Sequence, residues 1–458
     1  MHFTEAYSKT ELLKFIAMFS IVGMWLGSST TILTVLILFI FFSVFKNKLN
    51  AFFYVNIFLG VFLLENFFKI DTVQFHNFNN IDQLSSAYNI YLYTSYKALC
   101  VVIYFFIIFL ASKNKEFGIK EKILIYLFPF FVSTILLKYS KHNVLYPFLV
   151  LLLIMLSKSV FYILYYFECK KLNIGIFSFK NFFQPFCFPT SEICIPSPRY
   201  IGIGDKDKSK LIFKSLISIV IYKCIGIFIA NIINYLILKD NQIILDEVLF
   251  FNQKLIKVFN PGNKFGLLEI FLITFGYGTL FLQITFFTYS RVFFIFLQFM
   301  GFSIPDTIDS PEKSKSFSDF FSRTMHYYNL IINYFFFFPL MKYAKNFGIK
   351  VSANILLFIA LVFGGLYIHA LKDIYKLIQL GLFTYLQLLI QNIMPYLCLL
   401  ALAIIISHKY EKQSKSSPLK VLFYLFYYCS IVSLTTFKHF NDIKSFFDFY
   451  WGWLIRLL

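Results

Sequence analysis

The stretch "ANILLFIALVFGGLYIHAL", residues 353 to 371, decides what kind of fold this chain can have. It contains no charged side chain, and its length is close to the roughly 20 residues that a helix needs to cross the hydrocarbon core of a bilayer. Similar runs recur along the chain, for example "YPFLVLLLIMLSKSVFYILYYF" from 146 to 167. Repeated apolar runs of this length predict membrane-spanning helices.

The composition of the whole chain points the same way. Of its 458 residues, 59% are hydrophobic and 14% are charged, whereas soluble proteins have about 45–50% apolar and about 25% charged residues. We therefore predict an all-α polytopic membrane protein with about 11–13 transmembrane or re-entrant helices. The candidate segments are 11–27, 30–45, 50–67, 88–112, 121–137, 145–167, 211–238, 265–300, 326–341, 351–371, 376–406 and 419–437.

The chain is predicted to form a single integral membrane domain over residues 1–458. N-terminal helices occupy 1–168, a proline-rich cytoplasmic loop 169–210, a core 211–371 and C-terminal helices 372–458. Prolines at the density found in the loop forbid a continuous helix there.

One apolar run, 376–406, is long enough to need a closer look. It is interrupted by Gln387, Gln391, Asn392 and Pro395. Polar residues and proline within such a run favour two short segments over one continuous helix.

A polar segment, 301–320, leads directly into a helix that is rich in aromatic residues. Ser316 and Ser318 are candidate N-caps, because a serine hydroxyl can accept a hydrogen bond from a free backbone N–H of the first turn. Asp319 follows where the positive end of the helix dipole favours a carboxylate. We expect a capped helix to begin here.

The net charge of +19 would favour nucleic-acid binding in a soluble protein. In a membrane protein, cytoplasmic loops are enriched in lysine and arginine, so we predict topology as the cause and no nucleic-acid partner. The basic loops 46–49, 113–122 and 169–210 are separated by pairs of spans, which puts them on one side. Beyond residue 300, the basic stretches 342–350 and 408–420 are separated by irregular segments, and the sides of the membrane that these stretches face are left open.

Two of the seven histidines, His326 and His369, stand out because the others are terminal, lie in a polar loop or sit beside a lysine at a segment end. His369 lies at the end of the apolar run 353–371, and His326 lies where a polar segment enters an aromatic helix. Ionisable residues within the membrane usually face a protein interior or a water-filled cavity. The glycine pair before His369, Gly364 and Gly365, permits close helix approach or an irregular backbone. His369 is either an interhelical hydrogen-bonding residue or a general base, since desolvation favours the neutral imidazole that a base requires.

A resemblance to a known family bears on this choice. Within residues 277–340, the matching points are "TFFTY" (285–289), Gly301-Phe302, Pro311, "SDFFSR" (318–323) and Pro339-Leu340, and "GGLYIH" follows at 364–369. In order and spacing they resemble the signature of the membrane-bound O-acyltransferase (MBOAT) family, in particular its bacterial branch that acylates alginate and cell-wall polymers. The stretch "FPTSEICIPSPRY" (188–200) resembles a loop of that branch more weakly.

The chain departs from the family pattern at several points. Phe321 and Thr324 stand where the family motif Ser-Asp-Phe-Trp-x-Arg-Trp-His has tryptophans, and Met325 stands at its histidine, with His326 one residue later. His369 likewise lies one residue beyond the spacing of the family's Gly-Leu-Trp-His. One residue on a helix is a rotation of about 100°, so the resemblance implies a divergent member.

The resemblance implies an integral protein of the bacterial cytoplasmic membrane with no bound cofactor or metal. It implies transfer of an acyl group, acetyl or another short chain, from a cytosolic acyl-CoA or acyl-carrier thioester to a hydroxyl of an envelope or exported polysaccharide. His369 would be the general base, and His326 would help to position a substrate. The further substrate-binding candidates are Arg323, Asn329, Asn333 and Tyr367. An acyl carrier or an extracytoplasmic acyltransferase is an expected partner.

Two other functions remain open from the sequence. A lipid-directed acyltransferase of the same family would use the same site with a lipid acceptor. A transporter or flippase for lipid-linked sugars would need charges along its pathway, for which Lys97, Glu269 and Arg291 are the candidates.

Overall fold

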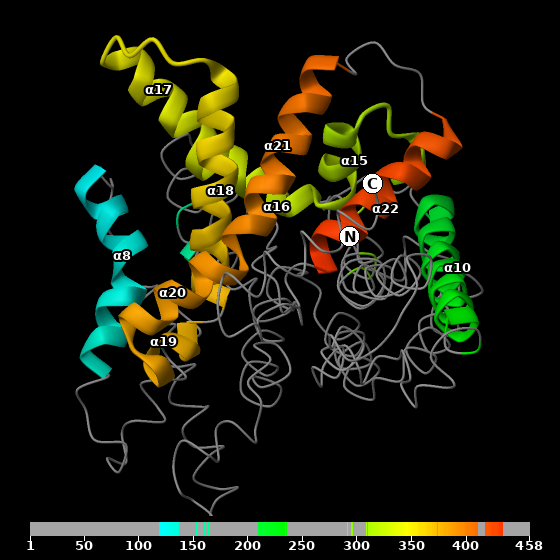
Figure 1. Ribbon diagram of the computed structural model, residues 1–458, viewed down its shortest axis with the longest axis horizontal. Helices are drawn as coiled ribbons and strands as arrows, with labels where there is room; N and C mark the ends of the chain where they lie inside the picture. The colour runs from blue at the N-terminus through cyan, green and yellow to red at the C-terminus, as the bar shows by residue number, and fades with distance from the viewer. Residues whose placement is uncertain are drawn as a thin grey trace, which may run out of the picture. The chain divides into compact units, whose positions relative to one another are not determined.

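Figure 1 shows the ribbon of the computed structural model of the chain. The residues that the structure describes are 119–136, 153, 157, 160, 161, 164, 209–233, 235, 291, 295, 308, 310–372, 374–410 and 417–433. Every regular element among these residues is a helix, which confirms the all-α prediction for this part of the chain. The segments predicted before residue 119, the proline-rich stretch 182–200 and most of 277–309 lie outside the described residues.

The helices are long at both ends of the described part and short in the middle. They are α8 (Ile119–Leu136), α10 (Ser209–Ile233), the 3-10 helix η8 (Pro311–Lys313), α15 (Phe317–Thr324), α16 (His326–Ile332), the π-helix η9 (Asn333–Phe337), α17 (Phe338–Asn346), α18 (Ala353–Lys372), α19 (Ile374–Leu380), α20 (Leu382–Asn392), α21 (Met394–Tyr410) and α22 (Pro418–Ser433). Of these, α8, α10, α18 and α22 match predicted spans closely.

Helix α18 is long and apolar enough to cross a membrane over Ala353–Leu371, with a mean hydropathy of 2.1. The pair Leu382–Gln391 and Met394–His408, bent by 41°, meets the same standard if it counts as one span. Among the described residues there are thus one or two helices of membrane-spanning length. The total of about 11–13 remains a prediction from the apolar runs.

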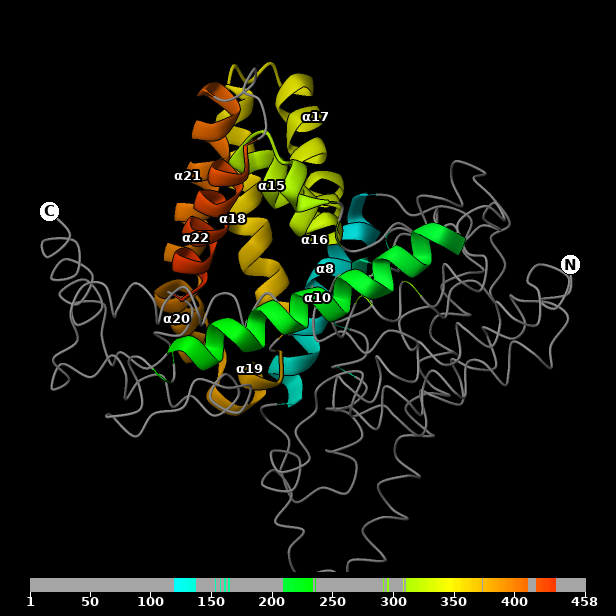
Figure 2. The ribbon, with the colours of Figure 1, turned by 90° about the vertical axis from the view of Figure 1, so that its right-hand side faces the viewer.

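The chain divides into two compact units, each described here by itself. The first comprises Met1–Ser218, Tyr289–Asp306 and Leu371–Leu382, and within it α19 packs against α8. The second comprises Ile219–Thr288, Thr307–Ala370 and Phe383–Leu458. In this second unit, α15 packs against α21 and α22, and α16, η9 and α17 follow one another (Figure 2). Helices α10 and α18 cross from one unit into the other.

The predicted interruption of the 376–406 run is confirmed. Helix α20 ends at Asn392, Ile393 forms a turn, and α21 begins at Met394 with Pro395 in its first turn. Proline is tolerated there because the first N–H groups of a helix have no intrahelical acceptor. A second break was not predicted: Gly381 adopts a φ of 82° between α19 and α20, a left-handed conformation that commonly ends a helix.

The aromatic helix predicted over 326–341 is also interrupted. Its middle turn, η9, is a π-helix in which the Phe338 N–H donates to the carbonyl of Asn333, and α17 then continues to Asn346. Pro339 lacks an N–H, and its ring would clash with the carbonyl four residues earlier in a regular α-helix. The wider π turn ahead of the proline relieves this conflict, and such turns are frequent at functional sites.

Large apolar side chains stay exposed in stripes along the outer helices of the second unit. On α21 the stripe consists of Leu399, Leu402 and Ile406, and on α20 of Phe383, Leu386 and Ile390. These residues recur at the spacing of one helix face. Extended apolar faces of this kind are rare on soluble proteins and suit a lipid environment.

Candidate functional site

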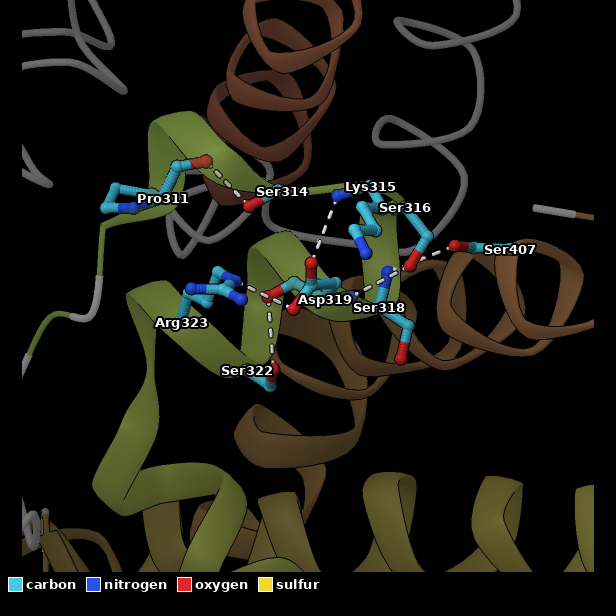
Figure 3. Close-up of polar contacts among 9 residues, drawn as sticks. All are labelled: Pro311, Ser314, Lys315, Ser316, Ser318, Asp319, Ser322, Arg323 and Ser407. Atoms are coloured by element: carbon cyan, nitrogen blue, oxygen red, sulfur yellow. Dashed lines mark hydrogen bonds and ion pairs between the residues drawn. The ribbon is translucent and has the colours of Figure 1, made fainter. Parts of the chain in front are cut away.

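The site begins at the N-terminus of α15, where a polar segment meets the helix (Figure 3). Ser316 is the N-cap: its Oγ accepts a hydrogen bond from the Asp319 N–H at 3.1 Å, as the sequence predicts. Ser318, the other predicted cap, has a different role. Its backbone N–H donates to Oγ of Ser407 on α21 at 3.0 Å, which ties the start of α15 to the end of α21.

Asp319 and Arg323 form an ion pair on the same side of α15. The Arg323 Nε donates to Asp319 Oδ1 at 2.8 Å, and the Lys315 N–H donates to Asp319 Oδ2 at 3.0 Å. The two charged side chains are 29% and 27% exposed. Arg323, predicted to bind a substrate phosphate or carboxylate, is therefore held in place by a carboxylate of its own helix, with an edge of the pair open to solvent.

Met325 forms an elbow between α15 and α16. Its backbone (φ −120°, ψ 48°) is not helical, and α16 begins at the next residue, His326. The polar atoms Thr324 Oγ1, His326 Nε2 and Tyr328 Oη are all buried around this elbow. Within the described part of the chain, Thr324 Oγ1 makes no hydrogen bond, although the residue is only 1% exposed. An unsatisfied buried hydroxyl is costly, so its retention calls for an explanation.

The glycine pair of α18 packs directly against this region. A methyl group added at Gly365 would lie 2.6 Å from the Tyr328 hydroxyl and 2.7 Å from Leu397 Cδ2, and one added at Gly364 would lie 2.8 Å from the Phe336 ring. Of the two roles that the sequence left open, the irregular backbone is not observed, because α18 stays regular through both glycines; side chains of the neighbouring helices pack against its backbone there. Helices α16, α18 and α21 thus meet at Gly365.

These contacts define how α18 runs past α16. Gly364 lies against the side chains of Ile332 and Phe336, and the next residue, Gly365, lies against the hydroxyl of Tyr328. His369 follows Gly365 by four residues, about 6 Å along the axis and about 40° around it. Half-buried His369 therefore lies on nearly the same face of α18 as Gly365, the face that contacts Tyr328 of α16.

The remaining predicted site residues also lie in the second unit. The Asn333 amide donates to Asn329 Oδ1 at 3.2 Å, so the two asparagines share a helix face and bond to each other. Tyr367 packs its ring against Phe336 of η9, with ring centroids 5.9 Å apart. All six predicted residues therefore belong to one compact unit.

Several polar residues went unnoticed in the sequence. Nothing in the sequence distinguished Tyr328 from the other tyrosines, and Thr324 was noted only because it stands where the family motif has a tryptophan. Lys223 is buried in the apolar helix α10 and belongs with the charges that a transporter would need. Arg291, already a candidate of that kind, is buried and donates from Nη1 to Ser218 Oγ at 2.7 Å within the first unit. Lys97 and Glu269 lie outside the described residues.

The comparisons with known proteins add no relative. No protein-family model matches the chain, and no curated protein is similar to it at a significant level. Among the described residues, no group of three histidine, cysteine, aspartate or glutamate side chains is placed to hold a metal ion. The resemblance to the membrane-bound O-acyltransferases therefore remains a prediction from the motifs.

Proposed function

We propose that this chain is a polytopic O-acyltransferase of the bacterial cytoplasmic membrane, related to the MBOAT family. In this proposal it moves a short acyl group from a cytosolic acyl-CoA or acyl-carrier thioester to a hydroxyl of an envelope or exported polysaccharide. The observation that carries the proposal is the packing of Tyr328, two residues after His326, onto Gly365 of α18, the helix that carries His369. Both histidines that the motifs single out, His326 and His369, belong to the unit in which this contact lies, which supports a shared site.

The surroundings of the two histidines are suited to a reaction. The π-helix η9, the elbow at Met325 and the unsatisfied Thr324 hydroxyl lie within a short segment of the chain. Local irregularity and unsatisfied buried groups are features that cluster at functional sites. The exposed apolar stripes on α20 and α21 support the membrane location of the site.

The proposed step needs no protein nucleophile. An imidazole nitrogen of His369 takes the proton of the acceptor hydroxyl, and the hydroxyl oxygen attacks the thioester carbonyl carbon. The carbon–oxygen bond forms, the carbon–sulfur bond breaks, and the proton passes from the imidazolium to the leaving thiolate. Holding donor and acceptor together supplies much of the rate enhancement, and His326 positions one of them.

The polar residues around the elbow have supporting roles in this proposal. Arg323, oriented by Asp319, contacts a phosphate or carboxylate group of the donor, a task that suits the planar guanidinium. Asn329 and Asn333 present a shared polar face along α16 and η9 to the acceptor. Tyr367 braces η9 through Phe336 and contacts a substrate with its remaining edge.

The decisive experiment measures ester-linked acyl groups on envelope polysaccharide, released by mild alkali and quantified. Cells carrying the intact gene are compared with a deletion strain and with strains that express His369→Ala, His326→Ala or His408→Ala at equal membrane levels. We expect His369→Ala to lower acyl transfer by about 100-fold or more, the usual contribution of a general base. His408, exposed near the end of α21, is the matched control and should leave acylation unchanged.

Each remaining outcome identifies a different function. Unchanged polysaccharide acylation in the deletion strain excludes this acceptor, and a loss of ester groups from the lipid fraction instead would identify the lipid-directed alternative. A fall in exported polysaccharide with normal acylation per sugar would favour the transporter, in which buried Lys223 would be the residue to vary. If the His369→Ala variant restored acylation fully where the deletion strain had lost it, the proposed family assignment would stand, but His369 would not be the base.

A further inference from the structure

One end of the second unit carries a group of exposed lysines. Lys342 and Lys345 lie on α17, and Lys350 lies in the connection to α18; all three are exposed. Between residues 320 and 372 the sequence contains no aspartate or glutamate. The positive charge of this turn is therefore not neutralised by carboxylates of its own segment.

Other basic residues gather at the same end. In both Figures 1 and 2, the turn between α17 and α18, the C-terminal end of α21 and the N-terminal end of α22 lie toward the same, upper, end of the second unit, spread across it. Lys420 on α22 is exposed. The hydrogen bond between the Ser318 N–H and Ser407 Oγ brings the start of α15 to this end as well, and with it the exposed Lys313 and Lys315.

Carboxylates in the described part of this end are few. Glu312 is exposed beside Lys313, and Asp319 is already paired with Arg323. The six lysines at this end thus outnumber the acidic groups that face them. We call this set, Lys313, Lys315, Lys342, Lys345, Lys350 and Lys420, the basic end.

Apolar and aromatic side chains lie among these lysines. Phe347 is 65% exposed and stacks on Tyr343 with ring centroids 4.4 Å apart, and Leu419 is 76% exposed. Aromatic rings and lysines mixed in this way are typical of the level where a bilayer's headgroups meet its hydrocarbon. A partner consisting only of soluble anions would have no use for the exposed apolar side chains.

We propose that the basic end binds the anionic phospholipid headgroups of the cytoplasmic leaflet. Charge complementarity with that leaflet carries the assignment, since clustered juxtamembrane lysines are attracted to its negative surface. The exposed rings then sit at the headgroup boundary, and the apolar stripes of α20 and α21 continue into the hydrocarbon. This inference goes beyond acyl transfer and holds whichever reaction the protein performs.

The proposal also gives the membrane orientation of the spans beyond residue 300, which the sequence left open. Helix α18 leaves the basic end and the bent pair α20 and α21 returns to it (Figure 1), so the basic stretch 342–350, the C-terminal end of α21 and the N-terminal end of α22 lie on the same, cytoplasmic, side. His369 is then 16 residues, about 24 Å, from the start of α18 at Ala353. In a hydrocarbon core of about 30 Å, it lies toward the extracytoplasmic face, where an exported acceptor would arrive.

The first test measures lipid-dependent stability of the purified full-length protein. It is placed in nanodiscs of phosphatidylcholine with or without phosphatidylglycerol, and the unfolding midpoint is recorded at low and high salt. We expect phosphatidylglycerol to raise the midpoint by several degrees at low salt, and the triple variant Lys342→Gln, Lys345→Gln, Lys350→Gln to lose most of that rise. The matched triple Lys→Arg variant should keep it, because charge and not lysine itself is required. Equal rises in wild-type and triple-Gln protein would overturn the proposal.

The second test measures which side of the membrane the basic end faces. Lys350→Cys is labelled with an impermeant maleimide in intact and in permeabilised cells, and the increase over the parent protein is recorded. Labelling only after permeabilisation is expected, and labelling in intact cells would overturn the proposal. Neither test measures acylation, so a failure here is distinct from a failure of the proposed function.

Discussion

At the start of α15, Ser316, Asp319 and Arg323 exchange hydrogen bonds with one another, and Ser318 bonds to Ser407 on α21. A few residues further along the chain, Thr324 Oγ1 at the end of α15 makes no hydrogen bond within the described residues although it is buried, and side chains of α16 and α21 pack against Gly365 of α18. Satisfied polar networks stabilise a fold, whereas unsatisfied buried groups destabilise it. The contrast is consistent with the proposal that the first region supports the fold and the second serves the reaction.

The largest loss of stability is expected when a bulky side chain replaces Gly365, where α16, α18 and α21 meet. Gly365→Leu places side-chain atoms where the Tyr328 hydroxyl and Leu397 already lie, and we expect the free energy of unfolding to fall by about 3 kcal/mol, as overpacking does. Thermal or denaturant unfolding of the purified protein measures the change. The control is Gly348→Leu, where no atom lies within 4 Å of an added Cβ and only the positive φ of 66° opposes the side chain. A larger loss for the control would contradict the close packing.

The polar network at α15 should respond to the loss of its central carboxylate. Asp319→Ala removes the acceptor for the Lys315 N–H and for Arg323 Nε, and we expect a loss of about 1–2 kcal/mol. The ion pair itself contributes little of this, because both side chains are partly exposed.

A double-mutant cycle with Arg323→Ala separates the two roles of the arginine. If Arg323 only supports the fold, both single variants and the double variant lose acyl transfer in proportion to stability. If it also binds the donor, Arg323→Ala raises the KM for the thioester at equal stability, while Asp319→Ala has a smaller effect. The cycle isolates the pair because each substitution removes the same contact.

The N-cap of α15 is expected to have a smaller effect. Ser316→Ala leaves the Asp319 N–H without its side-chain acceptor, which costs about 1 kcal/mol at a typical N-cap. Ser316→Asp, which supplies another acceptor, should preserve the unfolding midpoint. If Ser316→Ala and Ser316→Asp have the same unfolding midpoint, the cap makes no measurable contribution to stability.

The smallest expected change, and the one of opposite sign, is at Thr324. Thr324→Val replaces the unsatisfied hydroxyl with a methyl group and should raise the free energy of unfolding by about 0.5–1 kcal/mol. If the hydroxyl serves a substrate, acyl transfer should fall in the same variant, and Thr324→Ser should retain it. A variant that loses stability would show that the hydroxyl is satisfied in the folded protein, and the contrast between the two regions would then be wrong.

Much of the local structure could be predicted from the sequence because its causes are local. An uncharged apolar run dictates α18, Asn392 and Pro395 interrupt the 376–406 run, and Ser316 followed by Asp319 starts α15. Gly381 could also have been used to predict the end of a helix. The π turn before Pro339 was less accessible, since proline allows several ways to relieve its clash.

The site could be predicted only as a set of candidate residues. Spacing and motif resemblance selected His326 and His369, but a single residue of offset turns a helical side chain by about 100°. Whether Asn329 and Asn333 bond to another helix or to each other, and whether Arg323 is paired, depends on neighbours that no local pattern specifies.

Apolar length, polar interruption and capping chemistry determined by themselves that the described part of the chain is helical, that one or two of its helices are long and apolar enough to cross a membrane, and where several helices begin and end. Only the tertiary structure decided that side chains of α16 and α21 pack against Gly365 of α18, and that the α17–α18 turn, the C-terminal end of α21 and the N-terminal end of α22 lie toward one end of the second unit. The physical reason is the distance along the chain over which each kind of interaction acts. Backbone hydrogen bonding and hydrophobicity act within a few residues of the chain, whereas the close approach of two helices depends on side chains that are distant in the sequence and meet only in the folded protein.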